Sequence, residues 1–168
     1  MLKPEEEAQF LSILAPLLAH PKVEEMKTYI QHGSVTTYDH CLSVAEACFL
    51  YAKRHPKRRL DLPSLVRAAF LHDFYLYDWH TSGDGSHHFH GYRHAKRAME
   101  NAKTMFGISD IEAAMIFSHM WPLNITRIPK TREAWVLTLT DKKISLIETL
   151  TQRKAKKKAK KSDTKKAL

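Results

Sequence analysis

Histidine and aspartate residues recur along this 168-residue chain at positions where a helix would otherwise be apolar. An imidazole or a carboxylate is costly to bury unless another group pairs with it. A mixture of imidazole and carboxylate ligands suits first-row divalent metal ions. The candidate ligands, in chain order, are His40, His72, Asp73, His94, His119 and Asp141. Their types and order predict a metal centre.

The spacing of the neighbouring residues indicates that these side chains point toward a core. Mostly apolar residues follow His40 and precede His72 at the three-, four- and seven-residue steps that share one side of a helix. Asp141 comes four residues after Leu137 and three before Ile144, so its carboxylate stands where a leucine would be expected. Without a partner it would destabilise the fold or stay protonated.

The set resembles the HD superfamily of metal-dependent phosphohydrolases. The pattern of that superfamily is an upstream histidine, a central His-Asp doublet and a downstream aspartate, with two intervening histidines in its binuclear members. The matching stretches in this chain read TTYDHCLSVAEAC, VRAAFLHDFYLYDWH, GYRHAKRAMENA, AAMIFSHMWP and LTLTDKKIS. The resemblance covers roughly Thr36 to Leu150, and it implies an HD domain over residues 1–152.

The resemblance also implies an activity and its residues. We expect a phosphohydrolase that cleaves a phosphomonoester, a nucleotide or a phosphodiester through a metal-activated water. The expected ligands of one ion are His40, His72, Asp73 and Asp141. A second ion would be held by His94 and His119 as well. Asp73 would bridge the two ions and is the expected catalytic residue. Candidate contacts for a substrate phosphate are Arg93, Lys96, Arg97 and Lys142, for which a solvated helix surface is the alternative.

The ligand types narrow the choice of metal. Nitrogen and oxygen ligands together suit Mn²⁺ or Fe²⁺ better than Mg²⁺, which prefers oxygen. Cobalt, nickel and zinc are further candidates.

Two other functions fit the same ligands. Many hydrolytic members have a lysine three residues after the doublet, where this chain has Leu76. HD-type di-iron oxygenases, such as myo-inositol oxygenase, use the same six ligands, so an oxygenase is the first alternative. A non-catalytic metal-binding or sensing module is the second. The GYP element of cyclic-dinucleotide phosphodiesterases does not follow the metal histidines, which disfavours that subclass.

The net charge of +9 is concentrated in a tail. Residues 153–168 carry nine Lys or Arg and one Asp, which leaves the preceding domain nearly neutral. This low-complexity tail could attract nucleic acid or an anionic surface, although it has no aromatic residue for stacking on bases. The expected partner of the domain itself is a small phosphorylated substrate, and the oligomeric state stays open.

Hydropathy and cysteine usage favour a cytoplasmic protein. No apolar run approaches the roughly 18 residues of a membrane span, and the N-terminal segment is acidic where a signal peptide would be basic. Cys41 and Cys48 are seven residues apart on one expected helix, which is too far for an easy disulfide and fits a reducing compartment.

Capping and proline signals predict an all-α fold, a compact bundle of six or seven helices with an inward-facing metal centre. The expected helices are Pro4–Leu18, Pro21–Ile30, Thr37–His55, Pro63–His72, Tyr92–Phe106, Ser109–His119 and a last one from Thr131 into the tail. The segment Phe74–Gly91 is expected to be a loop that is either a substrate lid or a packed connector, with His80, His87, His88 and His90 as possible substrate contacts. No strand pattern of useful length is found.

Overall fold

The computed structural model describes residues 2–78 and 90–166. Seven α-helices, one short 3-10 turn and one two-stranded sheet make up the regular structure of these residues, which confirms the all-α fold class. The elements are α1 (Pro4–Leu18), α2 (Pro21–Glu25), β1 (Ile30–His32), β2 (Val35–Thr36), α3 (Thr37–Arg54), η1 (Pro56–Arg58), α4 (Leu62–Leu71), α5 (His90–Phe106), α6 (Asp110–Ser118) and α7 (Arg132–Lys166).

Short polar side chains set the starts of the helices that carry the candidate ligands. Thr36 caps α3 by accepting a hydrogen bond from the backbone N–H of Asp39 at 3.1 Å. Asp61 caps α4 in the same way. Ser109 and Glu112 form a reciprocal capping box at the start of α6. These caps satisfy backbone donors that have no partner within the helix, so they fix where each helix begins.

One expected helix is shorter than its sequence pattern indicates. The helix predicted from Pro21 to Ile30 ends at Glu25, and Ile30 instead pairs with Thr36 in a small antiparallel hairpin. Gly33 supplies the turn with a positive φ of 65°, a conformation that glycine adopts without a steric penalty. The β-branched residues on both sides favour extended backbone. Strands of two and three residues are too short to show an alternating pattern.

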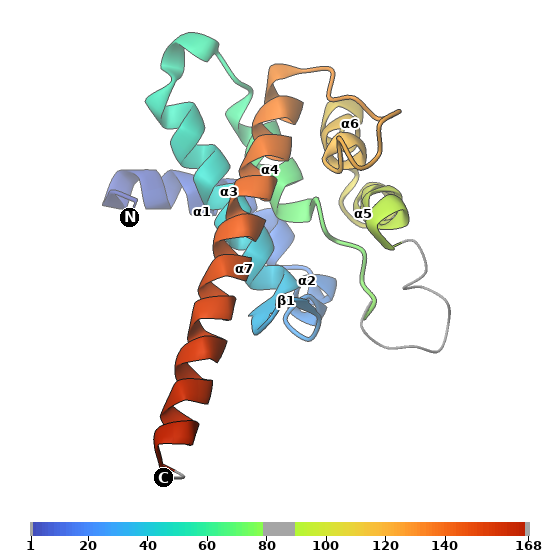
Figure 1. Ribbon diagram of the computed structural model, residues 1–168. Coiled ribbons are helices and arrows are strands. Elements are labelled where there is room, and N and C mark those ends of the chain that lie inside the picture. The colour runs from blue at the N-terminus through green and yellow to red at the C-terminus, as the bar shows by residue number, and fades with distance from the viewer. Residues whose placement is uncertain (1, 79–89, 167–168) are drawn as a thin grey trace.

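The core forms where α3, α4 and α7 lie side by side, with α6 packed between α4, α5 and α7 (Figure 1). Fully buried side chains from these helices include Val44, Phe49, Leu65, Met115 and Leu137. The helix ends that carry the candidate ligands therefore converge on one side of a single apolar cluster.

Helix α7 continues without a break from the core into the basic tail. Its backbone is helical to Lys166, and its last part projects beyond the other elements (Figure 1). In the part of the chain that the structure describes, no helix combines the length and the apolar character that crossing a membrane requires.

Candidate metal centre

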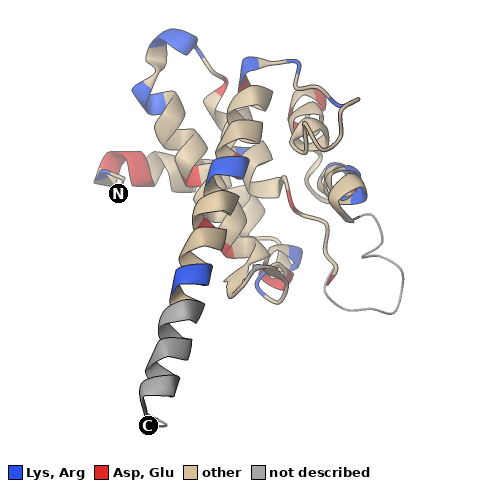
Figure 2. Cartoon of the chain, in the orientation of Figure 1, with Lys and Arg blue, Asp and Glu red and all other residues tan. Residues whose placement is uncertain are grey.

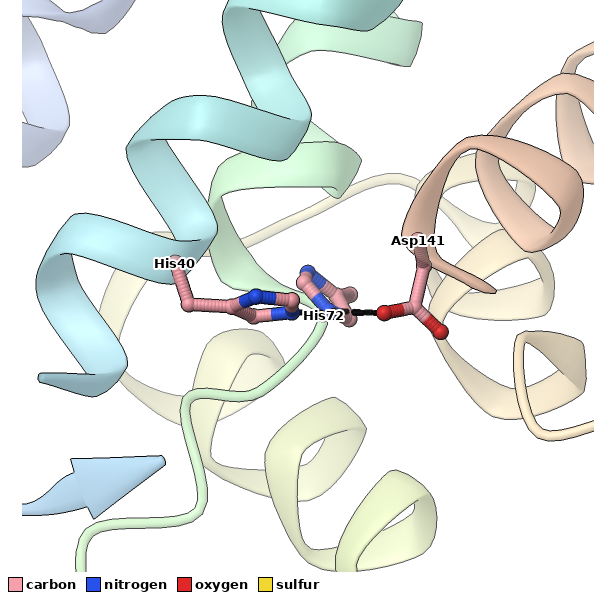
Figure 3. A group of neighbouring side chains, drawn as sticks. All are labelled: His40, His72 and Asp141. Atoms are coloured by element: carbon pink, nitrogen blue, oxygen red, sulfur yellow. Dashed lines mark hydrogen bonds and ion pairs between the residues drawn. The ribbon is translucent and has the colours of Figure 1, made fainter. Parts of the chain in front are cut away.

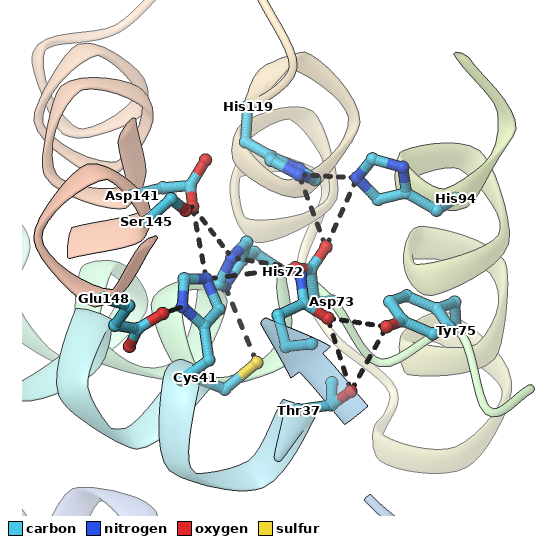
Figure 4. Close-up of polar contacts among 12 residues, drawn as sticks. Thr37, Cys41, His72, Asp73, Tyr75, His94, His119, Asp141, Ser145 and Glu148 are labelled. Atoms are coloured by element: carbon cyan, nitrogen blue, oxygen red, sulfur yellow. Dashed lines mark hydrogen bonds and ion pairs between the residues drawn. The ribbon is translucent and has the colours of Figure 1, made fainter. Parts of the chain in front are cut away.

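All six candidate ligands are buried and meet at one place. They come from five elements: the first turn of α3, the end of α4 and the residue after it, the start of α5, the end of α6 and the middle of α7 (Figure 4). None is more than 7% exposed to solvent, and the residues brought together are His40, His72, Asp73, His94, His119 and Asp141. This buried His/Asp cluster is the candidate site.

The first group of ligand atoms surrounds one carboxylate oxygen of Asp141. The Oδ1 atom of Asp141 lies 3.2 Å from Nε2 of His40 and 3.6 Å from Nε2 of His72 (Figure 3). The Oδ2 atom of Asp73 lies 3.4 Å from Nε2 of His72 and 4.0 Å from Nε2 of His40. His40, His72 and Asp141 could hold a metal ion.

The second group surrounds the other oxygen of Asp73. Its Oδ1 atom lies 3.3 Å from Nε2 of His94 and 3.5 Å from Nε2 of His119. The two imidazole nitrogens are themselves 3.1 Å apart. A second group of residues that could hold a metal ion consists of His72, Asp73 and His119. The two oxygens of one carboxylate thus face different sets of histidines.

The two histidines that end helices are oriented by the helices themselves. The Nδ1 atom of His72 lies 2.8 Å from the carbonyl oxygen of Ala69, and that of His119 lies 2.7 Å from the carbonyl oxygen of Ile116. In each case the acceptor is three residues earlier, in the last turn of the helix. An N–H at Nδ1 leaves the lone pair of Nε2 directed into the cluster, which is the usual arrangement of a metal-binding histidine.

Glu148 orients the third histidine. Its Oε2 atom lies 2.9 Å from Nδ1 of His40, on the side of the ring away from the cluster. Glu148 is not among the predicted site residues, although it lies seven residues after Asp141, a spacing that places both side chains on one face of a helix. Ser145, between them on the same face of α7, donates to Oδ1 of Asp141 at 3.2 Å.

The substitution Glu148→Gln is expected to weaken metal binding roughly 10- to 100-fold, the usual effect of losing a carboxylate behind a ligating histidine. An amide keeps the size of the side chain but loses the negative charge that makes His40 a stronger ligand. Metal titrations of both proteins, monitored by calorimetry, measure the change. Glu46→Gln, on α3 outside the cluster, is the matched control, and equal affinities for the wild type and Glu148→Gln would contradict the assignment.

Asp73 is held by residues from the hairpin and from the segment after α4. Gln31 donates from Nε2 to Oδ2 of Asp73 at 2.6 Å, and Tyr75 donates to Oε1 of Gln31 at 2.6 Å. Thr37 lies 3.2 Å from the Tyr75 hydroxyl. These buried hydrogen bonds are not predicted by the sequence, because Gln31 directly follows an expected helix and has no regular spacing from the candidate ligands. Together they fix the plane of the Asp73 carboxylate.

The donor atoms fit a divalent metal ion. Within the part of the chain that the structure describes, His72 Nε2 and Asp73 Oδ1 are buried without a hydrogen-bond partner. Folded proteins rarely leave such atoms unpaired, since each costs about 1–3 kcal/mol. The shorter separations between ligand atoms, 3.2–3.6 Å, match those of two ligands that share an ion at about 2.1 Å. Both the donor types and their spacing therefore suit a metal.

Without a metal, the cluster retains protons on its histidines. Burial opposes a charge on His40, but hydrogen bonds to Asp141 and Glu148 outweigh it and raise its pKa to about 10. Burial likewise opposes a charge on His72, yet the nearby carboxylate of Asp73 raises the pKa of that imidazole well above its usual range. Burial would raise the pKa of Asp73, but the charges of the surrounding histidines hold it well below its usual range.

Metal binding is therefore expected to release protons and to strengthen as the pH rises. An ion needs the lone pair of His40 Nε2, which carries a proton at neutral pH when the pKa is about 10. For each proton that metal binding displaces, a rise of one pH unit in this range lowers the metal dissociation constant about tenfold. Calorimetric titrations at several pH values, in two buffers of different ionisation enthalpy, count the protons. A dissociation constant that does not change with pH would contradict this expectation.

Of the four basic residues predicted to contact a phosphate, Lys142 lies at the cluster. Its Nζ atom donates to the carbonyl oxygen of His119 at 3.1 Å. Burial lowers its pKa, although Asp141 and Asp73 oppose the effect. The other three are exposed on α5, and Lys96 pairs there with Glu100 at 3.6 Å; they are Arg93, Lys96 and Arg97.

The structure also places three further residues that the sequence singled out. Leu76, where many hydrolytic members of the HD superfamily have a lysine, has a positive φ of 57° and packs against the core, so it offers no cation. Cys41 and Cys48 are buried and free, as the spacing predicted. The sulfur of Cys41 lies 3.8 Å from Nδ1 of His72. Cys41 is thus part of the wall behind a ligand.

The expected substrate lid falls largely on residues 79–89, which lie outside the described residues, as do His80, His87 and His88. The side chain of His90 lies outside them too.

Comparison of the chain with protein-family models, with curated proteins and with solved structures found no match in any of the three.

Proposed function

We propose that this chain is a metal-dependent phosphohydrolase of the HD type that acts on a phosphomonoester, a nucleotide or a phosphodiester. The observation that carries the proposal is the division of the ligands between the two oxygens of Asp73. One oxygen faces His40 and His72, and the other faces His94 and His119. A carboxylate shared in this way is suited to bridging two ions.

In this proposal His40, His72, Asp73 and Asp141 hold one ion, and Asp73, His94 and His119 hold the second. When bound, the two divalent ions would lower the pKa of a shared water and polarise the phosphoryl oxygens. Manganese or iron is the preferred metal because the ligands combine imidazole nitrogen with carboxylate oxygen.

The other residues of the site serve binding and orientation. Lys142 presents an ammonium group at the edge of the cluster, where it can donate a hydrogen bond to a phosphoryl oxygen and balance its charge. Gln31 and Tyr75 hold the Asp73 carboxylate in a single orientation. Since Leu76 cannot donate a proton, protonation of the leaving group does not depend on a side chain at that position.

We expect the protein to release phosphate from at least one phosphoester in the absence of oxygen. Hydrolysis needs only a Lewis acid and water, so Mn²⁺ or Co²⁺ should support it under strictly anaerobic conditions. The assay measures phosphate released from a panel of phosphomonoesters, nucleotides and cyclic nucleotides.

The Lys142→Gln variant should raise KM about tenfold, because a charge-assisted hydrogen bond contributes about 1.5–3 kcal/mol. Lys143→Gln, its exposed neighbour on α7, is the matched control.

A different outcome identifies the alternatives. If the isolated protein holds two irons, shows a mixed-valent resonance by electron paramagnetic spectroscopy and releases no phosphate from any ester, the oxygenase interpretation replaces this one. Metal binding with neither activity would favour a sensing module.

A further inference from the structure

After Leu137, which is buried in the core, the inward face of α7 is mainly polar. Positions four, seven and eleven residues after Asp141 share its face of the helix, and the residues there are Ser145, Glu148 and Gln152. Ser145 and Glu148 bond within the metal centre, and Gln152 donates to the side chain of Ser34 at 2.9 Å. A helix on the surface of a globular protein normally buries an apolar stripe instead.

The opposite side of α7 is apolar and exposed. Leu139, Leu146 and Leu150 are 57%, 60% and 46% exposed, and Ile147 beside them is 49% exposed. Steps of seven and eleven residues place the three leucines along one line of the helix, about 17 Å long. We call these four residues the outer stripe. In Figure 1 no other element is drawn in front of α7.

The outer stripe is accompanied by positive charge. Lys143 is exposed within it, and Arg153 and Lys154 are exposed directly after it. Figure 2 marks the Lys and Arg positions along α7 in blue. From residue 142 to residue 155 the sequence has one acidic residue, Glu148, and this side chain bonds to His40 on the inner face. The sequence beyond residue 155 continues with seven further lysines on the same helix backbone.

This combination selects one kind of partner. An exposed line of leucines beside lysine and arginine matches a surface with hydrocarbon beneath negative charge, as in an anionic lipid leaflet. A second copy of the chain would place cations against cations. A nucleic acid would engage the cations alone, since residues 136–168 contain no aromatic side chain for base stacking.

We propose that α7 docks the protein on the surface of an anionic lipid bilayer, with the outer stripe in the interface and the lysines over the headgroups. The inner face of the same helix carries Asp141 and stays on the protein. This proposal is independent of the reaction at the metal centre.

The test is sedimentation of the full-length protein with lipid vesicles. Vesicles of phosphatidylcholine with about 30% phosphatidylserine should bind the protein at low salt, whereas pure phosphatidylcholine should not. The double variant Leu146→Gln with Leu150→Gln should weaken binding at least tenfold. Ile125→Gln, which changes an equally apolar residue that is 73% exposed outside α7, is the matched control and should bind as the wild type does.

A second pair of variants tests the charge. Lys143→Gln and Lys154→Gln should each weaken binding about fivefold, and added salt should weaken it further. Absence of vesicle binding would overturn the proposal. Binding that the leucine variant leaves unchanged, and that RNA competes away, would show a nucleic-acid surface instead. A dimer detected by light scattering, lost in the leucine variant and without vesicle binding, would assign the outer stripe to a second copy.

Discussion

Replacing Asp73 with alanine is expected to remove both metal ions and to lower phosphoester hydrolysis roughly a thousandfold or more. Asp73 is the residue whose two oxygens face the two sets of histidines. Lewis-acid stabilisation by bound metal contributes several kcal/mol to the reaction, and about 4 kcal/mol corresponds to a thousandfold in rate. Metal content by plasma mass spectrometry and the rate of phosphate release measure the two effects.

In the Asp73→Ala variant, loss of metal has to be distinguished from loss of folding. Removing a buried carboxylate leaves protonated histidines facing one another, which destabilises the metal-free protein. Asp73→Asn keeps the shape of the side chain and one oxygen acceptor, so circular dichroism of both variants identifies any unfolding. Asp110→Ala changes an exposed acid of α6 that pairs with Lys103, and it should retain metal and activity. Full metal occupancy in a folded Asp73→Ala protein would refute the proposed centre.

The second large effect concerns the number of ions. His119→Ala is expected to lower the metal content from about two ions per chain to about one, because Nε2 of His119 and of His94 faces Oδ1 of Asp73, whereas His40 and His72 face its Oδ2. The helix that carries His119 keeps its cap at Ser109, so the fold should persist. Hydrolysis should fall at least a hundredfold, since losing one of two ions removes part of the stabilisation of the reacting oxygens.

A comparison among histidines makes this result specific. His94→Ala should reproduce the loss of one ion, whereas His40→Ala should remove the ion held by the other group. His55→Ala alters an exposed histidine at the end of α3 and should bind two ions. If His94→Ala and His119→Ala both retain the stoichiometry of the wild type, these two residues serve packing or substrate contact, and the centre is mononuclear.

The helical part of the fold was accessible from the sequence because the signals are local. The caps at Thr36, Asp61 and Ser109 and the spacing of apolar residues act within one or two turns. The hairpin at Gly33 was not predicted, because a two-residue strand gains its stability from packing on α3 and α7 and not from its own pattern.

Four basic residues looked equivalent in the sequence, yet the fold separates them. Lys142 reaches His119, and the three on α5 remain exposed. The difference depends on how α5, α6 and α7 are placed against one another, and no local spacing encodes that placement. The exposed position of the outer stripe of α7, in contrast, follows from the prediction that Asp141 faces the core, because the leucines lie on the other side of the helix.

The sequence by itself determined which side chains could serve as metal ligands and that each would face inward from a helix, because the type and the direction of a side chain are local properties. The tertiary structure alone decided how those ligands divide. Contacts such as His40 with Asp141 and with Glu148 join residues 101 and 108 positions apart, so they exist only once the helices have packed. The same packing placed Gln31 on Asp73, a contact between residues 42 positions apart that no local pattern encodes.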